Sequence, residues 1–140
     1  MSSTATFSPI AELARICVSV AQSDTADVYS VEVLSRLAGL SRRAFHNRCE
    51  AAGIAGRDCL HFVQCLRALI AADSKDWDPG ALIPVGDPRT LRKILMKARF
   101  DSAARPSIPT FVACQQFCTS VWFQESVLHT LEQWSPINPD

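Results

Sequence analysis

The chain has 140 residues, the size of a single domain, with 48% hydrophobic and 20% charged residues. This composition can bury a core and excludes a wholly disordered chain. The net charge is zero and there are only five glycines, which argues against a glycine-rich nucleotide loop or a many-turned β protein.

Membrane and export signals are absent from the printed sequence. No apolar run approaches the roughly 20 residues needed to span a bilayer, and the N-terminal residues lack the basic start and apolar stretch of a secretory signal. We therefore expect a cytoplasmic protein with no membrane partner. Irregular spacing favours reduced, mostly buried thiols over disulfides for the six cysteines: Cys17, Cys49, Cys59, Cys65, Cys114 and Cys118.

The chain reads as helices in its first half. Ser8 and Pro9 are typical of a helix start and predict a helix over 9–22, with a polar link to residue 29. Ser30 begins a second helix that Gly39 stops. Ser41 begins a third helix that closes at Gly53, and the two together fill 30–56. A longer helix is expected over 57–73, within a linker segment 57–75.

The second half continues the helical pattern after a proline-rich break. Pro79 and Pro84 limit the stretch after residue 75 to a turn and a short helix. Asp87 and Pro88 open another helix, which completes a segment 76–101. A single last helix is expected over 110–134, within 106–135. No segment alternates with period two, so the prediction is one all-α domain.

Charge is unevenly distributed along the chain. Residues 36–105 contain 13 of the 14 Lys and Arg but only seven of the 14 acids, so the middle carries +6 and the two flanks together −6. A basic centre between acidic ends is typical of a surface that binds a polyanion.

Two basic helices repeat one design 46 residues apart. In the alignment Phe45 corresponds to Leu91, Cys49 to Leu95 and Ala52 to Ala98 on the inward faces. The opposite faces and their flanks carry the candidate DNA-binding residues, and 88–100 contains no acid. These candidates are Arg42, Arg43, His46, Asn47, Arg48, Arg89, Arg92, Lys93, Lys97 and Arg99.

The chemistry of these two faces suits double-stranded DNA. A helix fits the major groove, where arginine reads guanine and asparagine reads adenine, so we assign base reading to Arg43, His46 and Asn47 and to Arg89, Arg92 and Lys93. We assign phosphate contacts to Arg42, Arg48, Lys97 and Arg99. Such contacts set the register of the protein on the duplex without reading its sequence. The alternative interpretation is two amphipathic helices with solvated basic faces.

The segment from Val33 to Gly53 resembles the first helix-turn-helix of AraC-type transcription regulators. Leu37-Ala38-Gly39-Leu40-Ser41, Phe45, Cys49 and Gly53 occupy the roles of that motif, and 65–72 resembles the family's linker helix. The resemblance covers about 31–101 and implies tandem motifs whose recognition helices enter successive major grooves. The second motif departs from the pattern, with two prolines in its leading helix and Arg99 in place of a closing glycine.

Other constellations point less clearly to chemistry. Cys59, His61 and Cys65 include zinc-ligand types, but their spacing favours a structural interpretation on one helix face, as it does for Cys114 and Cys118. We find no glycine-flanked serine, no paired carboxylates and no Cys-His pair with a reason to be adjacent. No enzyme activity, metal or cofactor is therefore expected.

The last helix carries the alternative function. Its aromatic residues spread over more than one face, which fits either packing on the N-terminal helix or a face for a homodimer or protein partner. In that alternative the helix-turn-helix shape has lost DNA binding. A regulator that binds a small molecule is the third interpretation.

Overall fold

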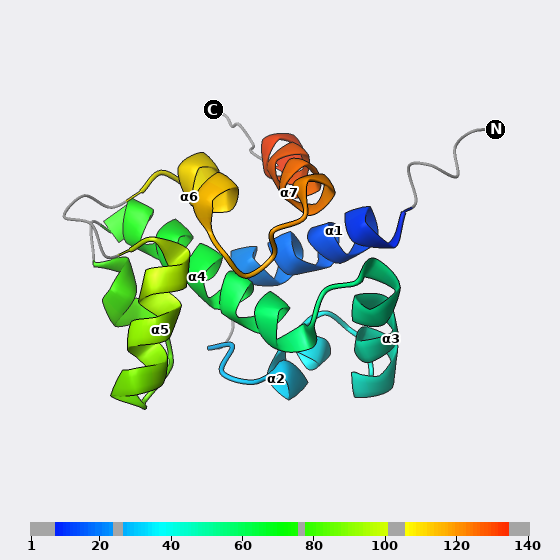
Figure 1. Cartoon of the computed structure of the whole chain (residues 1–140), viewed down its shortest axis with the longest axis horizontal. Helices are drawn as coiled ribbons and strands as arrows, with labels where there is room; N and C mark the ends of the chain where they lie inside the picture. The colour runs from blue at the N-terminus through cyan, green and yellow to red at the C-terminus, as the bar shows by residue number, and fades with distance from the viewer. Residues whose placement is uncertain (1–7, 24–26, 76–77, 101–105, 135–140) are drawn as a thin grey trace.

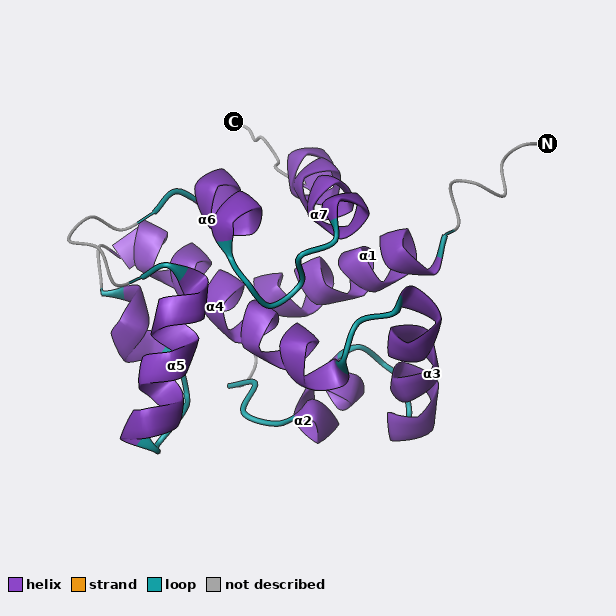
Figure 2. Cartoon of the chain, viewed as in Figure 1, coloured by secondary structure: helices purple, strands orange, loops and turns teal. Residues whose placement is uncertain are grey.

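The computed structural model describes residues 8–23, 27–75, 78–100 and 106–134. These residues are helical with no strand among them, which confirms the all-α prediction (Figure 2). None of the described helices is both long and apolar enough to cross a membrane. The elements are α1 (Pro9–Gln22), α2 (Val31–Leu37), α3 (Arg42–Ala52), α4 (Gly56–Lys75), the 3₁₀ helix η2 (Pro79–Leu82), α5 (Pro88–Ala98), α6 (Ile108–Cys114) and α7 (Val121–Trp134).

Helix starts are determined locally, by side chains that cap free backbone N–H groups. Six of the described α-helices begin after a serine or aspartate whose side-chain oxygen accepts a hydrogen bond from the first turn, and each such cap stabilises a helix by about 1 kcal/mol. The cap residues are Ser8, Ser30, Ser41, Asp87, Ser107 and Ser120. The predicted starts at the first four of these are confirmed, as is the span 9–22.

Helix α4 is the centre of the molecule (Figure 1). Helices α1, α2, α3, α5 and α6 and the 3₁₀ helix η2 all pack against it. Phe62, on α4, is fully buried, with its ring stacked 5.4 Å from that of Phe111 and edge-on 5.2 Å from that of Phe123. One core therefore runs from α4 to the C-terminal helices.

A group of buried thiols joins three helices. Cys59 of α4 contacts Cys17 of α1 and Cys49 of α3, and all three side chains are buried. The hydrogen bond to the Cys59 thiol, together with burial, raises the pKa of Cys17 and that of Cys49. The Cys17 and Cys49 thiols therefore remain protonated, and all three side chains fill the core as small apolar groups.

The C-terminal region differs from the prediction of one helix over 110–134. Two helices, α6 and α7, are separated by a turn at 115–120. The buried Gln115 side chain donates hydrogen bonds to the carbonyls of Val112 (3.2 Å) and Cys118 (2.7 Å). It accepts hydrogen bonds from the N–H groups of Phe117 (2.8 Å) and Cys118 (2.9 Å). The single-helix prediction is wrong because this amide satisfies the backbone groups that a continuous helix would pair.

Helix α7 is partly core and partly surface. It packs on α1, as the first of the two sequence interpretations expects, and buries Phe123 and Val127 completely. Val121 and Trp122, at its start, are 62% and 71% exposed. The side chain of Trp134 lies outside the described part of the chain.

Only the first of the two predicted motifs has two α-helices. Helices α2 and α3 are joined by a tight turn in which Gly39 has φ 76° and the Leu40 N–H donates to the Ser35 carbonyl at 2.9 Å. In the second segment the four-residue 3₁₀ helix η2, rather than an α-helix, precedes α5. Its predicted ends at residues 76, 77 and 101 lie outside the described residues, and the tandem arrangement stays a prediction.

The Gln115 hydrogen bonds generate a stability prediction. Gln115→Ala leaves buried carbonyl and N–H groups without partners, so we expect the free energy of unfolding to fall by about 2–3 kcal/mol in urea denaturation. Gln116→Ala is the matched control, because the Gln116 side chain is exposed. Equal effects of the two substitutions would contradict the role given to Gln115.

Candidate nucleic-acid interface

Helices α3 and α5 have the same length and the same ends, displaced by 46 residues. Each has 11 residues, between a capping residue (Ser41 or Asp87) and a residue in the left-handed conformation. That residue is Gly53 in α3 (φ 72°) and Arg99 in α5 (φ 64°). The sequence repeat is therefore also a repeat of local structure.

The hydrogen bonds that end the two helices are also equivalent. The Ile54 N–H donates to the Cys49 carbonyl at 3.1 Å, and the Phe100 N–H donates to the Leu95 carbonyl at 2.9 Å. The left-handed residue donates its own N–H one turn back in both helices. Both ends are thus Schellman motifs, which usually place glycine at the left-handed position.

The exposed positions coincide as well. In α3 and its closing residue they are 42, 43, 46, 47, 50, 51 and 53, and in α5 they are 88, 89, 92, 93, 96, 97 and 99. Every member of the second set lies 46 residues after a member of the first. The two helices therefore present equivalent outward faces.

The outward face of α3 mixes charge and hydrogen-bonding groups. Arg42, Arg43, His46 and Asn47 are exposed, as the sequence predicts for base-reading and phosphate-binding residues. The His46 imidazole Nε2 lies 3.8 Å from the carboxylate of Glu50 one turn later. This face therefore offers hydrogen-bond donors to a ligand, with the carboxylate of Glu50 lying among them.

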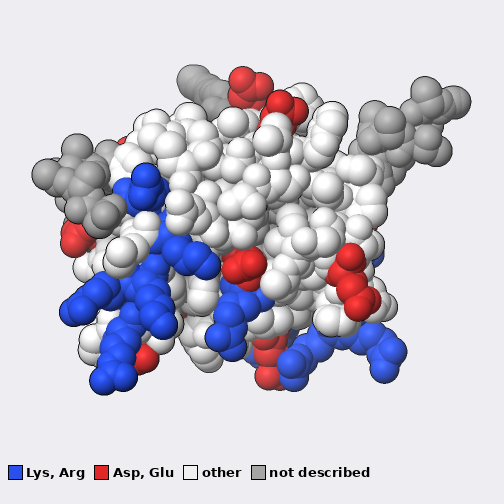
Figure 3. All heavy atoms as spheres, in the orientation of Figure 1, with Lys and Arg blue, Asp and Glu red and all other residues white. Residues whose placement is uncertain are grey.

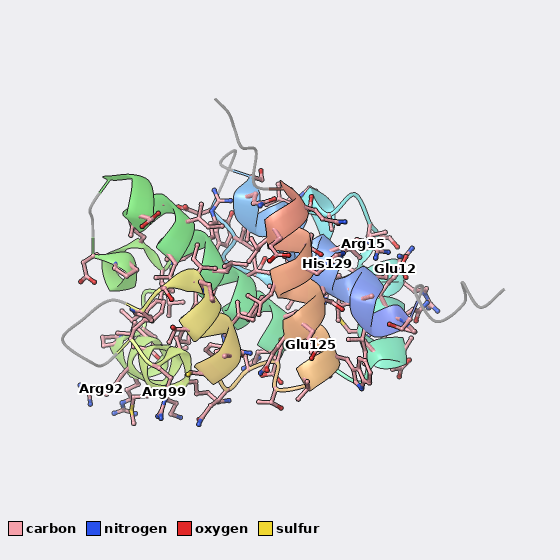
Figure 4. The ribbon with its side chains drawn as sticks, turned by 90° about the horizontal axis from the view of Figure 1, so that it is seen from above. Glu12, Arg15, Arg92, Arg99, Glu125 and His129 are labelled. Carbon is pink, nitrogen blue, oxygen red and sulfur yellow. The ribbon has the colours of Figure 1, made fainter. Side chains whose placement is uncertain are left out.

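The outward face of α5 is more basic. All five of its predicted DNA-binding residues are exposed: Arg89, Arg92, Lys93, Lys97 and Arg99. In Figure 3 Lys and Arg side chains gather along the lower side of the molecule, most densely over α5. Arg92 and Arg99 extend from α5 at the edge of the molecule in Figure 4.

The nearby acid on α5 is occupied in capping. The carboxylate of Asp87 accepts hydrogen bonds from the Thr90 hydroxyl (2.8 Å) and the Arg89 N–H (3.3 Å). These hydrogen bonds, first that of Thr90, lower the pKa of Asp87. The acid thus caps the helix N-terminus, and its charge also interacts with that of Lys93.

Arg48 differs from the other candidates. It is half-buried, and its guanidinium is paired with the carboxylate of Glu12 on α1. The ion pair joins α3 to α1. Arg48 therefore already has a partner within the described structure.

The turn between α6 and α7 holds the C-terminal end of α5. The Gln116 N–H donates to the Lys97 carbonyl at 2.9 Å, and the Lys97 ammonium lies 5.7 Å from the centre of the Phe117 ring. The centres of the Phe117 and His61 rings lie 5.7 Å apart, and the two rings form an edge-to-face pair. Burial, and then the charge of Arg57, lower the pKa of His61.

Sequence reasoning overlooked two exposed arginines beside these helices. Arg36 lies in the last turn of α2 and Arg57 in the first turn of α4. Arg57 and Lys97 of α5 both act electrostatically on His61, so cationic side chains also lie between α4 and α5. Their signal in the sequence was the basic excess over 36–105, which extends beyond the two helices.

The remaining cysteine and histidine constellations lie on several elements of the described structure. Cys59 and Cys65 are buried on α4, Cys118 is buried in the turn and Cys114 is exposed at the end of α6. Within the described ranges no three His, Cys, Asp or Glu side chains are arranged to hold a metal ion. A hollow of about 260 Å³ beside α3, lined by His46, Cys49 and Gly53 among others, is mostly apolar.

Comparison of this chain with known proteins finds no similar protein. No protein-family model, no curated protein and no solved structure matches this chain. The resemblance to AraC-type regulators therefore stays a prediction, and the candidate interface depends on the geometry of α3 and α5.

The equivalent ends of α3 and α5 predict opposite effects on stability when a Cβ is removed from one left-handed residue and added to the other. Arg99→Gly removes a Cβ from a left-handed residue, so we expect the free energy of unfolding to rise by about 0.5–1 kcal/mol. Gly53→Ala adds a Cβ at the equivalent place and should lower it by about 1 kcal/mol, although space there is open. Chemical denaturation measures both changes.

Gly86→Ala serves as the control for this pair. Gly86 has open space around it and no positive φ, so the substitution should change stability little. Changes of the same sign at positions 53 and 99 would contradict the equivalence of the two helix ends.

Proposed function

We propose that the protein binds double-stranded DNA through the outward faces of α3 and α5 and acts as a cytoplasmic transcription regulator. One observation carries the proposal: two helices of equal length, with equivalent ends and equivalent exposed positions, present basic side chains. In Figure 1 they flank α4 on the side of the molecule away from α6 and α7. This arrangement supports simultaneous contact with one duplex.

Base reading in this proposal falls to the exposed residues of the first two turns. Each helix is about 16 Å long, short enough to lie in a major groove. Arg43, His46 and Asn47 would donate to base edges from α3. Arg89, Arg92 and Lys93 would do so from α5, and arginine can bind guanine through two parallel hydrogen bonds.

Phosphate binding falls to the flanking cations. Arg42, Lys97 and Arg99 are exposed beside the base-reading stripes, and Arg57 at the start of α4 extends this set. Arg48 is left out, because its ion pair with Glu12 would have to break. Since α5 carries five exposed cations and α3 also carries Glu50, α5 contributes more of the salt-dependent affinity.

The proposal predicts salt-dependent binding that two arginine substitutions affect differently. Fluorescence anisotropy with labelled duplexes should give an affinity whose logarithm falls linearly with the logarithm of salt concentration. Arg43→Ala should weaken binding to the preferred sequence by about 1–3 kcal/mol and reduce the preference for that sequence over others. Arg42→Ala should weaken all sequences alike and reduce the salt slope by about one.

Arg15→Ala is the charge-matched control for these variants. Arg15 is exposed on α1 and belongs to neither outward face, and in Figure 4 it lies toward the opposite end of the molecule from Arg92 and Arg99. It should bind DNA as the native chain does. Absence of binding by the native chain at about 50 mM salt, where phosphate contacts are strong, would refute the proposal.

A second candidate is protein binding, including self-association, through the start of α7. The observation that favours it is the exposure of Val121 and Trp122 side by side in sequence. Trp122→Ser should then abolish any increase of mass with concentration in sedimentation velocity, because it removes the larger apolar contact. A native chain that stays monomeric at about 100 μM would exclude self-association of functional strength.

A further inference from the structure

One outward position distinguishes the chemistry of the two repeated helices. Position 50 of α3 and position 96 of α5 are equivalent and exposed, but the first is Glu50 and the second Met96. Both lie one turn beyond the central polar residues of their helix face. The repeat therefore presents a carboxylate at one site and an apolar thioether at the other.

Met96 has no evident role in the core. Its side chain is 56% exposed, whereas Ile94 and Ala98 on the opposite face are buried and Leu91 and Leu95 are partly buried. The exposed side chains around Met96 on α5 are cationic. A large apolar side chain thus stands alone in the most basic surface of the described chain.

The position of Met96 continues the base-reading stripe. Arg89, Arg92, Lys93 and Met96 have the spacing i, i+3, i+4 and i+7, which places them on one helix face. Seven residues rise by about 10 Å, which corresponds to about three base-pair steps of roughly 3.4 Å. A helix lying along the groove would therefore place Met96 over a base pair about three steps from the one that Arg89 contacts.

The major groove offers one apolar group to such a side chain. This group is the C5-methyl of thymine, which proteins recognise by apolar contact. Methionine is unbranched and polarizable and adapts its shape to the surface it meets. The surrounding cations favour binding of the phosphates, so the thioether would face the base edges between them.

We propose that Met96 is a specificity-determining residue that contacts the C5-methyl group of a thymine in the DNA segment bound by α5. The inference rests on the proposed DNA-binding function. It gives the two helices different preferences, because Glu50 at the equivalent position can accept a hydrogen bond from the amino group of cytosine. The bound sequence is then asymmetric although the two helices share one shape.

The test compares thymine with uracil, which lacks the methyl group. The preferred duplex is first selected from a random pool with the native chain, and each thymine is then replaced singly by deoxyuridine. At one position near the bases that Arg89 contacts, replacing thymine should lower the affinity about three- to five-fold, as expected for loss of one buried methyl group. Anisotropy titrations at constant salt measure the change.

Two variants assign this difference to Met96. Met96→Ala should bind the thymine and uracil duplexes equally, while Met96→Leu, which keeps an apolar side chain of similar size, should retain the preference. Glu50→Gln, at the equivalent position of α3, should leave the thymine-to-uracil ratio unchanged. Because position 96 is exposed, the variants should keep the native thermal midpoint.

The outcomes separate this inference from the proposed function. If the native chain binds no duplex, the proposed function itself fails. If it binds with sequence preference but no thymine replacement matters, or if Met96→Ala keeps the preference for thymine, DNA binding stands and the role of Met96 is refuted.

Discussion

Burial of α4 is the constraint on which the rest of the structure depends. Phe62, Val63, Leu66 and Leu69 are removed from water by elements on several sides of this helix. Burying each such side chain contributes about 1.5–3 kcal/mol, so apolar burial holds the covering elements on α4. Helices α3 and α5 are both among them, so one shared helix contributes to the placement of each.

Polar contacts refine this placement where apolar packing ends. The Gln64 side chain, buried in α4, donates to the Val28 carbonyl at 2.8 Å and fixes the segment that enters α2. Gly56 begins α4 close to the Phe45 ring of α3, where a Cβ would meet that ring at 3.6 Å. The ion pair between Arg48 and Glu12 adds a link from α3 to α1. Helix α3 thus packs against α1, α2 and α4.

Features set by neighbouring residues could be predicted from the sequence, and features set by distant contacts could not. Caps such as Ser41 and stops such as Gly53 act within one turn, so α1, α3 and α5 were predicted closely. The break at Gln115 depends on burial of an amide in the folded molecule, which helical periodicity does not register. At the candidate site, exposure of the arginines followed from the repeat, but the partner of Arg48 lies 36 residues away.

The two repeated helices, α3 and α5, have the same backbone conformation but different surroundings. Helix α3 follows an α-helix and a glycine turn, whereas α5 follows the 3₁₀ helix η2 and is held at its other end by the Gln116 N–H. Arg99 occupies a left-handed conformation that glycine would adopt more easily. A cation at that place thus costs some conformational energy, while it enlarges the positive surface of α5.

The buried thiols also make the chain a reporter of its own local stability. A thiol in the core reacts with an alkylating reagent only when the surrounding element opens, so its labelling rate measures the free energy of that opening. Cys17, Cys49, Cys65 and Cys118 report on α1, α3, α4 and the turn after α6, and the exposed Cys114 supplies a reference rate. The native sequence therefore allows the order in which its elements open to be mapped without introducing a label.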